Sequence, residues 1–177
     1  MCGVVGISGV ENAAQQAFLA MYALQHRGQE AGGIVAFDGE DGRLHKGSGL
    51  VSEIFDPESL EGLSGSTAIG HVRYSTAGGS DPANIQPITA RYRLGDLALA
   101  HNGNLTNQRA LRTSLVEDGA IFSSSSDSET LVHLIAKSRA KTVDDQVMDA
   151  LSHLSGAFSM ALVVGGKLYA ARDPRGF

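Results

Sequence analysis

The sequence has one cysteine, no tryptophan and four prolines among its 177 residues. A single cysteine excludes an internal disulfide and a cysteine-cluster metal site. No apolar run approaches the roughly 20 residues that a membrane-spanning helix needs. The net charge of −5 provides no cationic field for nucleic acid or for an anionic membrane. No charged-then-apolar leader opens the chain, so we expect a cytoplasmic protein that binds neither membranes nor nucleic acid.

Glycine, at 22 residues, and hydrophobic residues, at 42%, are plentiful. They indicate a buried core with many tight turns or close backbone approaches. The expected elements run strand, helix, several strands, helices and a closing hairpin. This order lacks the regular strand–helix alternation of a parallel sheet. It therefore favours an α+β fold, with mostly antiparallel sheets and helices packed outside them.

The expected elements follow from hydrophobic periodicity and turn signals. Strands are predicted at 3–8, 33–38, 43–51, 66–76 and 96–105, helices at 13–26 and 107–117, and a hairpin turning at Gly165-Gly166. Two more helices are expected after the serines at 123–126 and after Thr142, and a loop at 77–87. Helix caps are predicted at Asn12 with Gln15, Thr106, Ser126 with Glu129, and Thr142.

The only cysteine directly follows the initiator methionine, in "MCGVVGIS". If Met1 is removed, Cys2 carries a free α-amine, whose reference pKa is about 7.7–8.0. Such an amine can take the thiol proton as a general base, as N-terminal threonine enzymes do. The alternative is an incidental cysteine in a frayed terminus.

A nucleophile that attacks a carbonyl needs an oxyanion hole. In "AHNGNL", Asn102 offers a side-chain amide donor and Gly103 a backbone N–H with no Cβ beside it. Asn-Gly is also a common hairpin turn, but the segment that follows is predicted to be a helix. Six histidines are present without a zinc-type spacing, so no metal site is expected.

Two charged residues could hold a ligand that carries both charges. Arg73 lies in an apolar strand and needs an anion, either a ligand carboxylate or a protein partner such as Glu30 or Asp127. Asp127 precedes a helix, where it could be a cap or could hold an ammonium group. Together they could read both charged ends of a free amino acid.

Five motifs in order carry a family resemblance: "CGVVGI", "LQHRGQEAGGI", "GHVRYSTAGG", "LAHNGNLTN" and "SDSE". The chain resembles the class II glutamine amidotransferases, which are N-terminal nucleophile hydrolases, through nearly its whole length. The resemblance implies a four-layer αββα sandwich. It also implies that the chain hydrolyses L-glutamine through a thioester and releases ammonia.

The resemblance also implies roles for particular residues. Cys2 is the nucleophile, and Asn102 and Gly103 form the oxyanion hole. Arg73 holds the substrate carboxylate and Asp127 its amino group. Thr76 and Gly28 lie near the ligand, and Arg27 organises the site. Apart from the resemblance, the glycines of the loop at 76–84 permit motion, so we expect this loop to close over glutamine.

Within the class, "HVRYSTAGG" and "HNGNLTN" are most similar to the motifs of enzymes that act in purine synthesis and carry a phosphoribosyltransferase domain. The resemblance then implies a glutaminase domain at 2–177, with the C-terminal phosphoribosyltransferase domain absent. This domain would need no cofactor; magnesium, and in some relatives an iron–sulfur cluster, would belong to the missing part. In the full-length protein, this domain is expected to contact its own C-terminal domain. The full-length protein is also expected to form a homo-oligomer. This chain alone should make no phosphoribosylamine.

Two alternatives stay open. One is the glutaminase domain of a glucosamine-6-phosphate synthase. Such enzymes typically have tryptophan where this chain has Tyr74, and they tend to have "SETDTE" where this chain has "SSDSE". The other is an inactive amidotransferase-like domain that senses glutamine, which retention of Met1 would support.

Overall fold

The computed structural model describes residues 1–74 and 81–176. The strands are β1 (Gly3–Ser8), β2 (Ala31–Asp38), β3 (Asp41–Ser48), β4 (Thr67–Arg73), β5 (Ile88–Tyr92), β6 (Gly95–Leu105), β7 (Gly156–Val164) and β8 (Lys167–Arg172). The helices are α1 (Ala13–Ala23), α2 (Val51–Ile54), α3 (Pro57–Gly62), α4 (Gln108–Glu117), α5 (Ser128–Lys137) and α6 (Val143–Ser152), with 3₁₀ turns η1 (Gln25–Arg27) and η2 (Pro82–Asn84).

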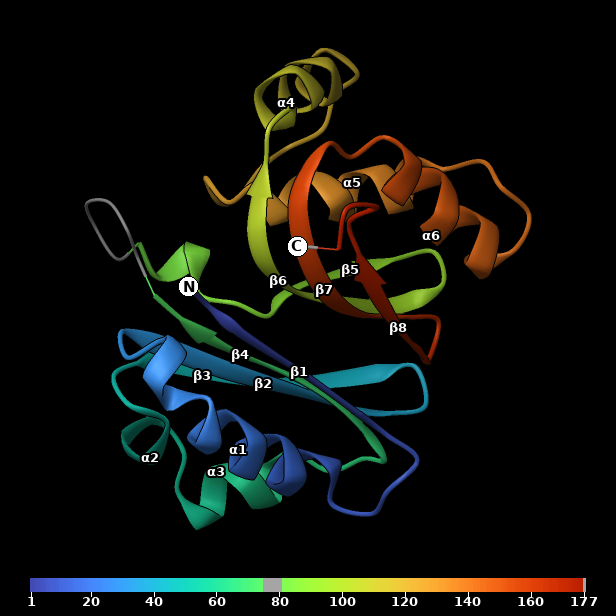
Figure 1. The fold of residues 1–177 in the computed structure, drawn as a ribbon. Coiled ribbons are helices and arrows are strands. Elements are labelled where there is room, and N and C mark those ends of the chain that lie inside the picture. The colour runs from blue at the N-terminus through green and yellow to red at the C-terminus, as the bar shows by residue number, and fades with distance from the viewer. Residues whose placement is uncertain (75–80, 177) are drawn as a thin grey trace.

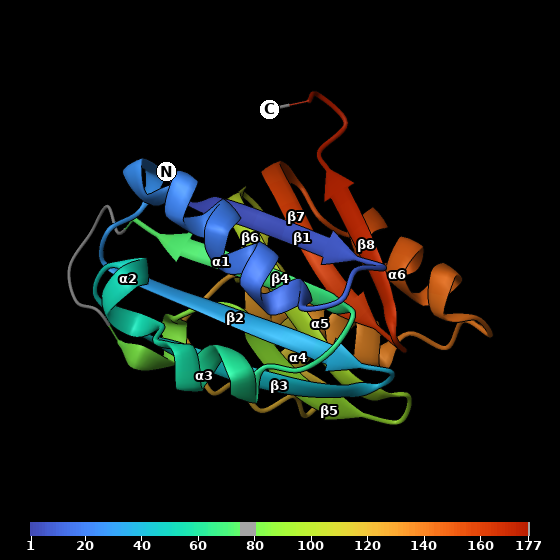
Figure 2. The ribbon, with the colours of Figure 1, turned by 90° about the horizontal axis from the view of Figure 1, so that it is seen from below.

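The strands form two four-stranded antiparallel sheets that lie face to face. Sheet A has the order β1-β4-β2-β3 and sheet B the order β5-β6-β7-β8. Helices α1, α2 and α3 lie on the outer side of sheet A, and α4, α5 and α6 lie beyond sheet B (Figure 1). The view from below shows α1 and α3 lying across the strands of sheet A (Figure 2).

Three apolar layers hold this sandwich together because successive side chains of a strand point to opposite faces. Met21 of α1 packs on one face of sheet A, and Leu131 of α5 on one face of sheet B. The inner faces of the two sheets meet through a third cluster of buried side chains: Val35, Phe37, Ile69, Ala98, Ala100, Ala161 and Val163. The predicted αββα sandwich with antiparallel sheets is therefore confirmed.

Several local predictions are confirmed. Gly165 and Gly166 both have positive φ, 56° and 73°, and join β7 to β8. Such values suit glycine in a two-residue turn of the mirror-image type. The Thr142 side chain accepts a hydrogen bond from the Asp145 backbone and caps α6.

Other local predictions are wrong. The strand expected at 43–51 ends at Ser48, and α2 begins at Val51 because the Glu53 carboxylate accepts the Leu50 N–H at 2.8 Å. The sequence pattern predicts no strand at β5, an edge strand of only five residues in which Thr89 and Arg91 are exposed.

Three of the predicted helix caps are also wrong. Asn12 has φ 57° and makes no side-chain cap. Helix α4 begins after Asn107 rather than after Thr106. Glu129 bonds to Ser123 and Ser124 instead of completing a box with Ser126. The partners of Glu129 come from the preceding loop, which sequence spacing does not reveal.

Two properties of the described part of the chain bear on its function. None of its helices is long and apolar enough to cross a membrane. No group of three or more His, Cys, Asp or Glu side chains among these residues could hold a metal ion.

Candidate active site

The predicted nucleophile and oxyanion donor lie side by side. Cys2 stands just before β1, and its backbone nitrogen donates to Oδ1 of Asn102 in β6 at 3.2 Å. Its thiol lies 3.8 Å from the carbonyl oxygen of Tyr74, at the end of β4. Because Oδ1 of Asn102 faces the Cys2 nitrogen, Nδ2 is the end of the amide that can donate to a substrate oxygen.

Arg27 fixes the backbone of the nucleophile. Its Nε donates to the carbonyl oxygen of Cys2 at 3.1 Å, and Nη2 lies 3.9 Å from Sδ of Met1. The organising role expected for Arg27 fits this geometry. Cys2 is half-buried and Met1 is 74% exposed, so methionine removal needs no opening of the core.

Gly103 occupies a position that only glycine fills without strain. Its φ is 155°, and a Cβ there would lie 2.1 Å from the carbonyl oxygen of Ala157 and 2.8 Å from Nε2 of His101. A side chain would force β6 and β7 apart. The glycine therefore keeps the end of β6, including Asn102, closely paired with β7.

Arg73 is the last residue of β4, the strand that pairs with β1 and so lies beside the start of the chain. Its Nη1 is buried and has no hydrogen-bond partner within the part of the chain that the structure describes. A buried guanidinium N–H without a partner is costly, so an anionic ligand would stabilise this site. Gly28 packs on the same backbone: a Cβ there would lie 2.6 Å from the carbonyl carbon of Arg73.

Asp127 stands at the N-cap position of α5, but its side chain does not cap the helix. The carboxylate instead turns to β6. One oxygen accepts the N–H of Leu105 at 3.2 Å, and the other lies 3.4 Å from Nδ1 of His101. These contacts tie Asp127 to the strand that carries Asn102.

The environment of Asp127 keeps its carboxyl ionised. Burial raises its pKa, but the hydrogen bond and charge of His101 and the backbone N–H groups of Leu105 and Ser128 lower it by more. The pKa therefore lies below its ordinary value. A half-buried, ionised carboxylate can hold an ammonium group at neutral pH.

The structure joins some of the predicted site residues by direct contacts and leaves others apart. Cys2, Asn102 and Arg27 are joined by direct hydrogen bonds, and Gly28 contacts the Arg73 backbone. Asp127 contacts Leu105 and His101 of β6, the strand that carries Asn102, and the structure gives no direct contact between Asp127 and Asn102 among the described residues. Thr76, and the part of the expected loop up to residue 80, lie outside the described residues.

Sequence reasoning missed a buried network behind the oxyanion strand. His101 points away from Asn102 toward α5, where its Nδ1 lies 3.1 Å from Oγ of Ser128. Its backbone N–H donates to Oε1 of Gln86, and its carbonyl oxygen lies 3.2 Å from Nε2 of His71. The alternation of a strand places neighbours on opposite faces, which could have assigned His101 to this side.

His71 is a packed core residue, as expected from its strand. It is fully buried, and burial lowers its pKa to about 3, against the smaller opposing effect of its hydrogen bond to His101. A ring that stays neutral at this depth is structural rather than a proton carrier at neutral pH.

Known proteins resemble this chain in sequence. A family model described as a glutamine amidotransferase domain matches residues 71–177. Amidophosphoribosyltransferase 3 of Arabidopsis thaliana, a chloroplastic protein, is 53% identical over 99% of this chain and 33% of its own length. An amidophosphoribosyltransferase of Lacticaseibacillus casei is 48% identical over 99% of this chain and 91% of that protein.

The fold matches as well as the sequence. The structure of glutamine phosphoribosylpyrophosphate amidotransferase from B. subtilis, complexed with ADP and GMP, superposes with a TM-score of 0.91 at 45% identity, over 99% of this chain and 38% of the other. The chain spans about a third of the length of the plant relative. It has the N-terminal nucleophile hydrolase fold. These similarities and the site geometry show that the chain belongs to the amidophosphoribosyltransferase family and matches its glutamine amidotransferase domain.

Proposed function

We propose that this chain is a glutaminase that uses Cys2 as its nucleophile. The observation that carries the proposal is the hydrogen bond between the Cys2 nitrogen and Asn102, which lie 100 positions apart. It places a thiol, the nitrogen that becomes the α-amine once Met1 is removed, and an amide donor at one point. Acyl transfer from an amide requires those three groups.

The proposed reaction has two halves. The Cys2 sulfur bonds to the amide carbon of glutamine, and the carbonyl electrons move to an oxygen held by Asn102 and Gly103. The thiol proton passes to the α-amine and then to the leaving nitrogen, so the C–N bond breaks and ammonia departs. Water then adds to the thioester, the C–S bond breaks, and glutamate leaves with the thiol restored.

The substrate's charged ends would be held apart from its reacting amide. The buried Nη1 of Arg73 is available to the α-carboxylate, since a guanidinium fork suits a carboxylate. The ionised Asp127 suits the α-ammonium group. Gly28 keeps Arg73 in place and Arg27 keeps Cys2 in place. Thr76 lies outside the described residues, and its expected role near the ligand rests on the resemblance alone.

The role in a longer protein follows from the relatives. They are named amidophosphoribosyltransferases, and the B. subtilis structure is named for phosphoribosylpyrophosphate. We propose that residues 2–177 are the glutaminase domain and that ammonia passes to a C-terminal domain that makes phosphoribosylamine for purine synthesis. The glucosamine-6-phosphate alternative is not favoured by these relatives. A cytoplasmic location is also proposed, although the Arabidopsis relative is chloroplastic.

The test is an intact mass before and after incubation with a diazo-ketone analogue of glutamine, with the adduct mapped by peptide. We expect loss of Met1 and one adduct on Cys2, which excess glutamine prevents. Cys2→Ala is the matched control and should take no adduct. A retained Met1 without an adduct would overturn the proposal in favour of a glutamine-sensing domain.

A further inference from the structure

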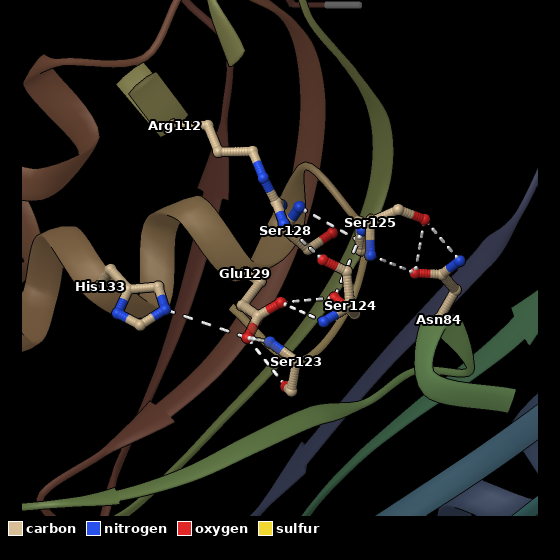
Figure 3. A network of polar contacts seen from close by, with 9 residues as sticks. Asn84, Arg112, Ser123, Ser124, Ser125, Ser128, Glu129 and His133 are labelled. Carbon is tan, nitrogen blue, oxygen red and sulfur yellow. Dashed lines mark hydrogen bonds and ion pairs between the residues drawn. The ribbon is translucent and has the colours of Figure 1, made fainter. Parts of the chain in front are cut away.

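The loop that leads into Asp127 is folded around one buried carboxylate (Figure 3). Glu129, which is 5% exposed, accepts four hydrogen bonds. Its Oε1 accepts the backbone N–H and the hydroxyl of Ser123, at 2.8 and 2.9 Å. Its Oε2 accepts the same two groups of Ser124, at 2.8 and 2.6 Å. The side chain of one helix residue thus fixes the two serines that stand four and five positions before the start of α5.

Two serine hydroxyl groups, those of Ser124 and Ser126, connect this loop to α5 through successive hydrogen bonds, which we call the serine relay. Oγ of Ser124, held by Glu129, accepts the backbone N–H of Ser126 at 3.3 Å. Oγ of Ser126 accepts the backbone N–H of Ser128 at 3.3 Å. Ser128 is the first residue of α5, whose leading N–H groups need acceptors from outside the helix.

Asp127 stands at the N-cap position of α5 but does not cap it, and its backbone is helical, with φ −63° and ψ −27°. An aspartate at an N-cap ordinarily accepts a backbone N–H of the first turn. Here Ser126 accepts the N–H of Ser128, and the Asp127 carboxylate contacts Leu105 and His101 of β6. The Ser128 hydroxyl also donates to Oδ1 of Asp127 at 3.4 Å, so the carboxylate lies between β6 and the first residue of α5.

The loop is anchored on two further sides. Nη2 of Arg112 in α4 donates to the carbonyl oxygen of Ser124 at 2.8 Å. Asn84 of η2 accepts the N–H of Ser125 at 3.1 Å, and its Nδ2 donates to the Ser125 hydroxyl at 2.9 Å. His133 also faces Glu129, with Nε2 3.9 Å from Oε1.

We propose that Glu129 and Ser124 are positioning residues for recognition of the substrate's α-amino group. They hold the loop in a conformation that directs the Asp127 carboxylate at β6. This inference rests on the proposed glutaminase function, in which Asp127 binds the ammonium group. Neither residue touches substrate in this arrangement.

The test compares two substrates with the full 177-residue chain. L-glutamine carries the α-amino group, and 4-carbamoylbutanoate has the same carboxylate and amide without it. The quantity measured is kcat/KM for each substrate. The value for L-glutamine divided by the value for 4-carbamoylbutanoate reports recognition of the amino group alone. We expect Glu129→Gln and Ser124→Ala to lower the ratio about tenfold, since hydrogen bonds to charged groups are involved. The value for 4-carbamoylbutanoate should change less than twofold.

Two matched variants separate positioning from general loosening. Ser123→Ala also removes a hydroxyl bonded to Glu129, but Ser123 passes no hydrogen bond to Ser126; it should leave the ratio within about twofold of the parent chain. Asp144→Asn removes a carboxylate of α6 that accepts hydrogen bonds from Lys167 and Tyr169, which take no part in the bonds of Glu129 described above. It should leave the ratio unchanged.

The outcomes are distinguishable. Turnover of glutamine by the parent chain with an unchanged ratio in Ser124→Ala overturns this inference and leaves the proposed function standing. An equal fall in Ser123→Ala also overturns it, because the relay then has no special part. If Glu129→Gln does not fold, Ser124→Ala decides alone. No turnover of either substrate by the parent chain overturns the proposed function, and the inference with it.

Discussion

The backbone nitrogen of Cys2 lies 3.2 Å from Oδ1 of Asn102. This contact joins the start of β1 in sheet A to the end of β6 in sheet B, so the site lies where the two sheets meet at one end of the sandwich. The same amide group can hold the nitrogen of the nucleophile through its oxygen and the substrate oxyanion through its nitrogen.

Asn102→Asp tests this double use. Aspartate keeps an oxygen for the Cys2 nitrogen but has no N–H for the oxyanion. We expect kcat for glutamine to fall about 10²–10³-fold, the usual effect of removing one oxyanion donor, with KM changed much less. Steady-state ammonia release measures both constants. A KM rise with unchanged kcat would assign Asn102 to ground-state binding instead.

Arg73→Lys tests carboxylate recognition. Lysine keeps the charge but lacks the planar fork, so two parallel hydrogen bonds to a carboxylate cannot form. We expect kcat/KM for glutamine to fall roughly 10–100-fold. Arg91→Lys is the matched control, because that side chain is 74% exposed and pairs with the carboxylates of Asp41 and Asp96. Parent-like activity in Arg73→Lys would argue that the arginine is a structural cation.

Gly28→Ala tests the close approach of η1 to β4. Its new Cβ would lie 2.6–2.7 Å from backbone atoms of Arg73 and Val72, so the chain must shift at a cost of about 1–3 kcal/mol. Gly62→Ala is the control, since no atom lies within 4 Å of its Cβ position; it should be neutral or stabilising by up to about 1 kcal/mol. Urea unfolding gives both values. Equal stability of the two variants would contradict the close packing.

The pH dependence of stability tests the buried His71. Its pKa is about 3 in the folded chain against an ordinary value of 6.5. Below about pH 6.5 the unfolded chain therefore binds a proton that the folded chain refuses, and stability falls as pH is lowered. The slope from this group approaches about 1.4 kcal/mol per pH unit.

His71→Gln should remove that slope between about pH 6.5 and 4.5, because glutamine does not titrate and can still donate to the His101 carbonyl. Carboxyls with lowered pKa, Asp127 and Glu129 among them, lose their stabilising effect only below their ordinary values of 3.8 and 4.5. Urea unfolding across this range gives the two curves. Parallel curves for the parent and the variant would show that His71 does not govern acid sensitivity.

Much of the fold was predictable because its signals are local. The Gly165-Gly166 turn and the Thr142 cap act within four residues, and both were predicted correctly. The edge strand β5 was missed because five residues with exposed Thr89 and Arg91 carry too short a pattern. The cap expected from Ser126 and Glu129 failed because Glu129 has better partners in Ser123 and Ser124.

The sequence by itself determined which groups could do chemistry: one cysteine beside the terminus, an Asn-Gly pair after an apolar strand, and one arginine in another strand. Only the tertiary structure decided that Cys2 meets Asn102 and that Asp127 faces β6 instead of capping its own helix. Spacing predicts contacts within an element, because helices and strands have fixed periods. Contacts between the two sheets depend on how whole layers pack, and no local pattern contains that information.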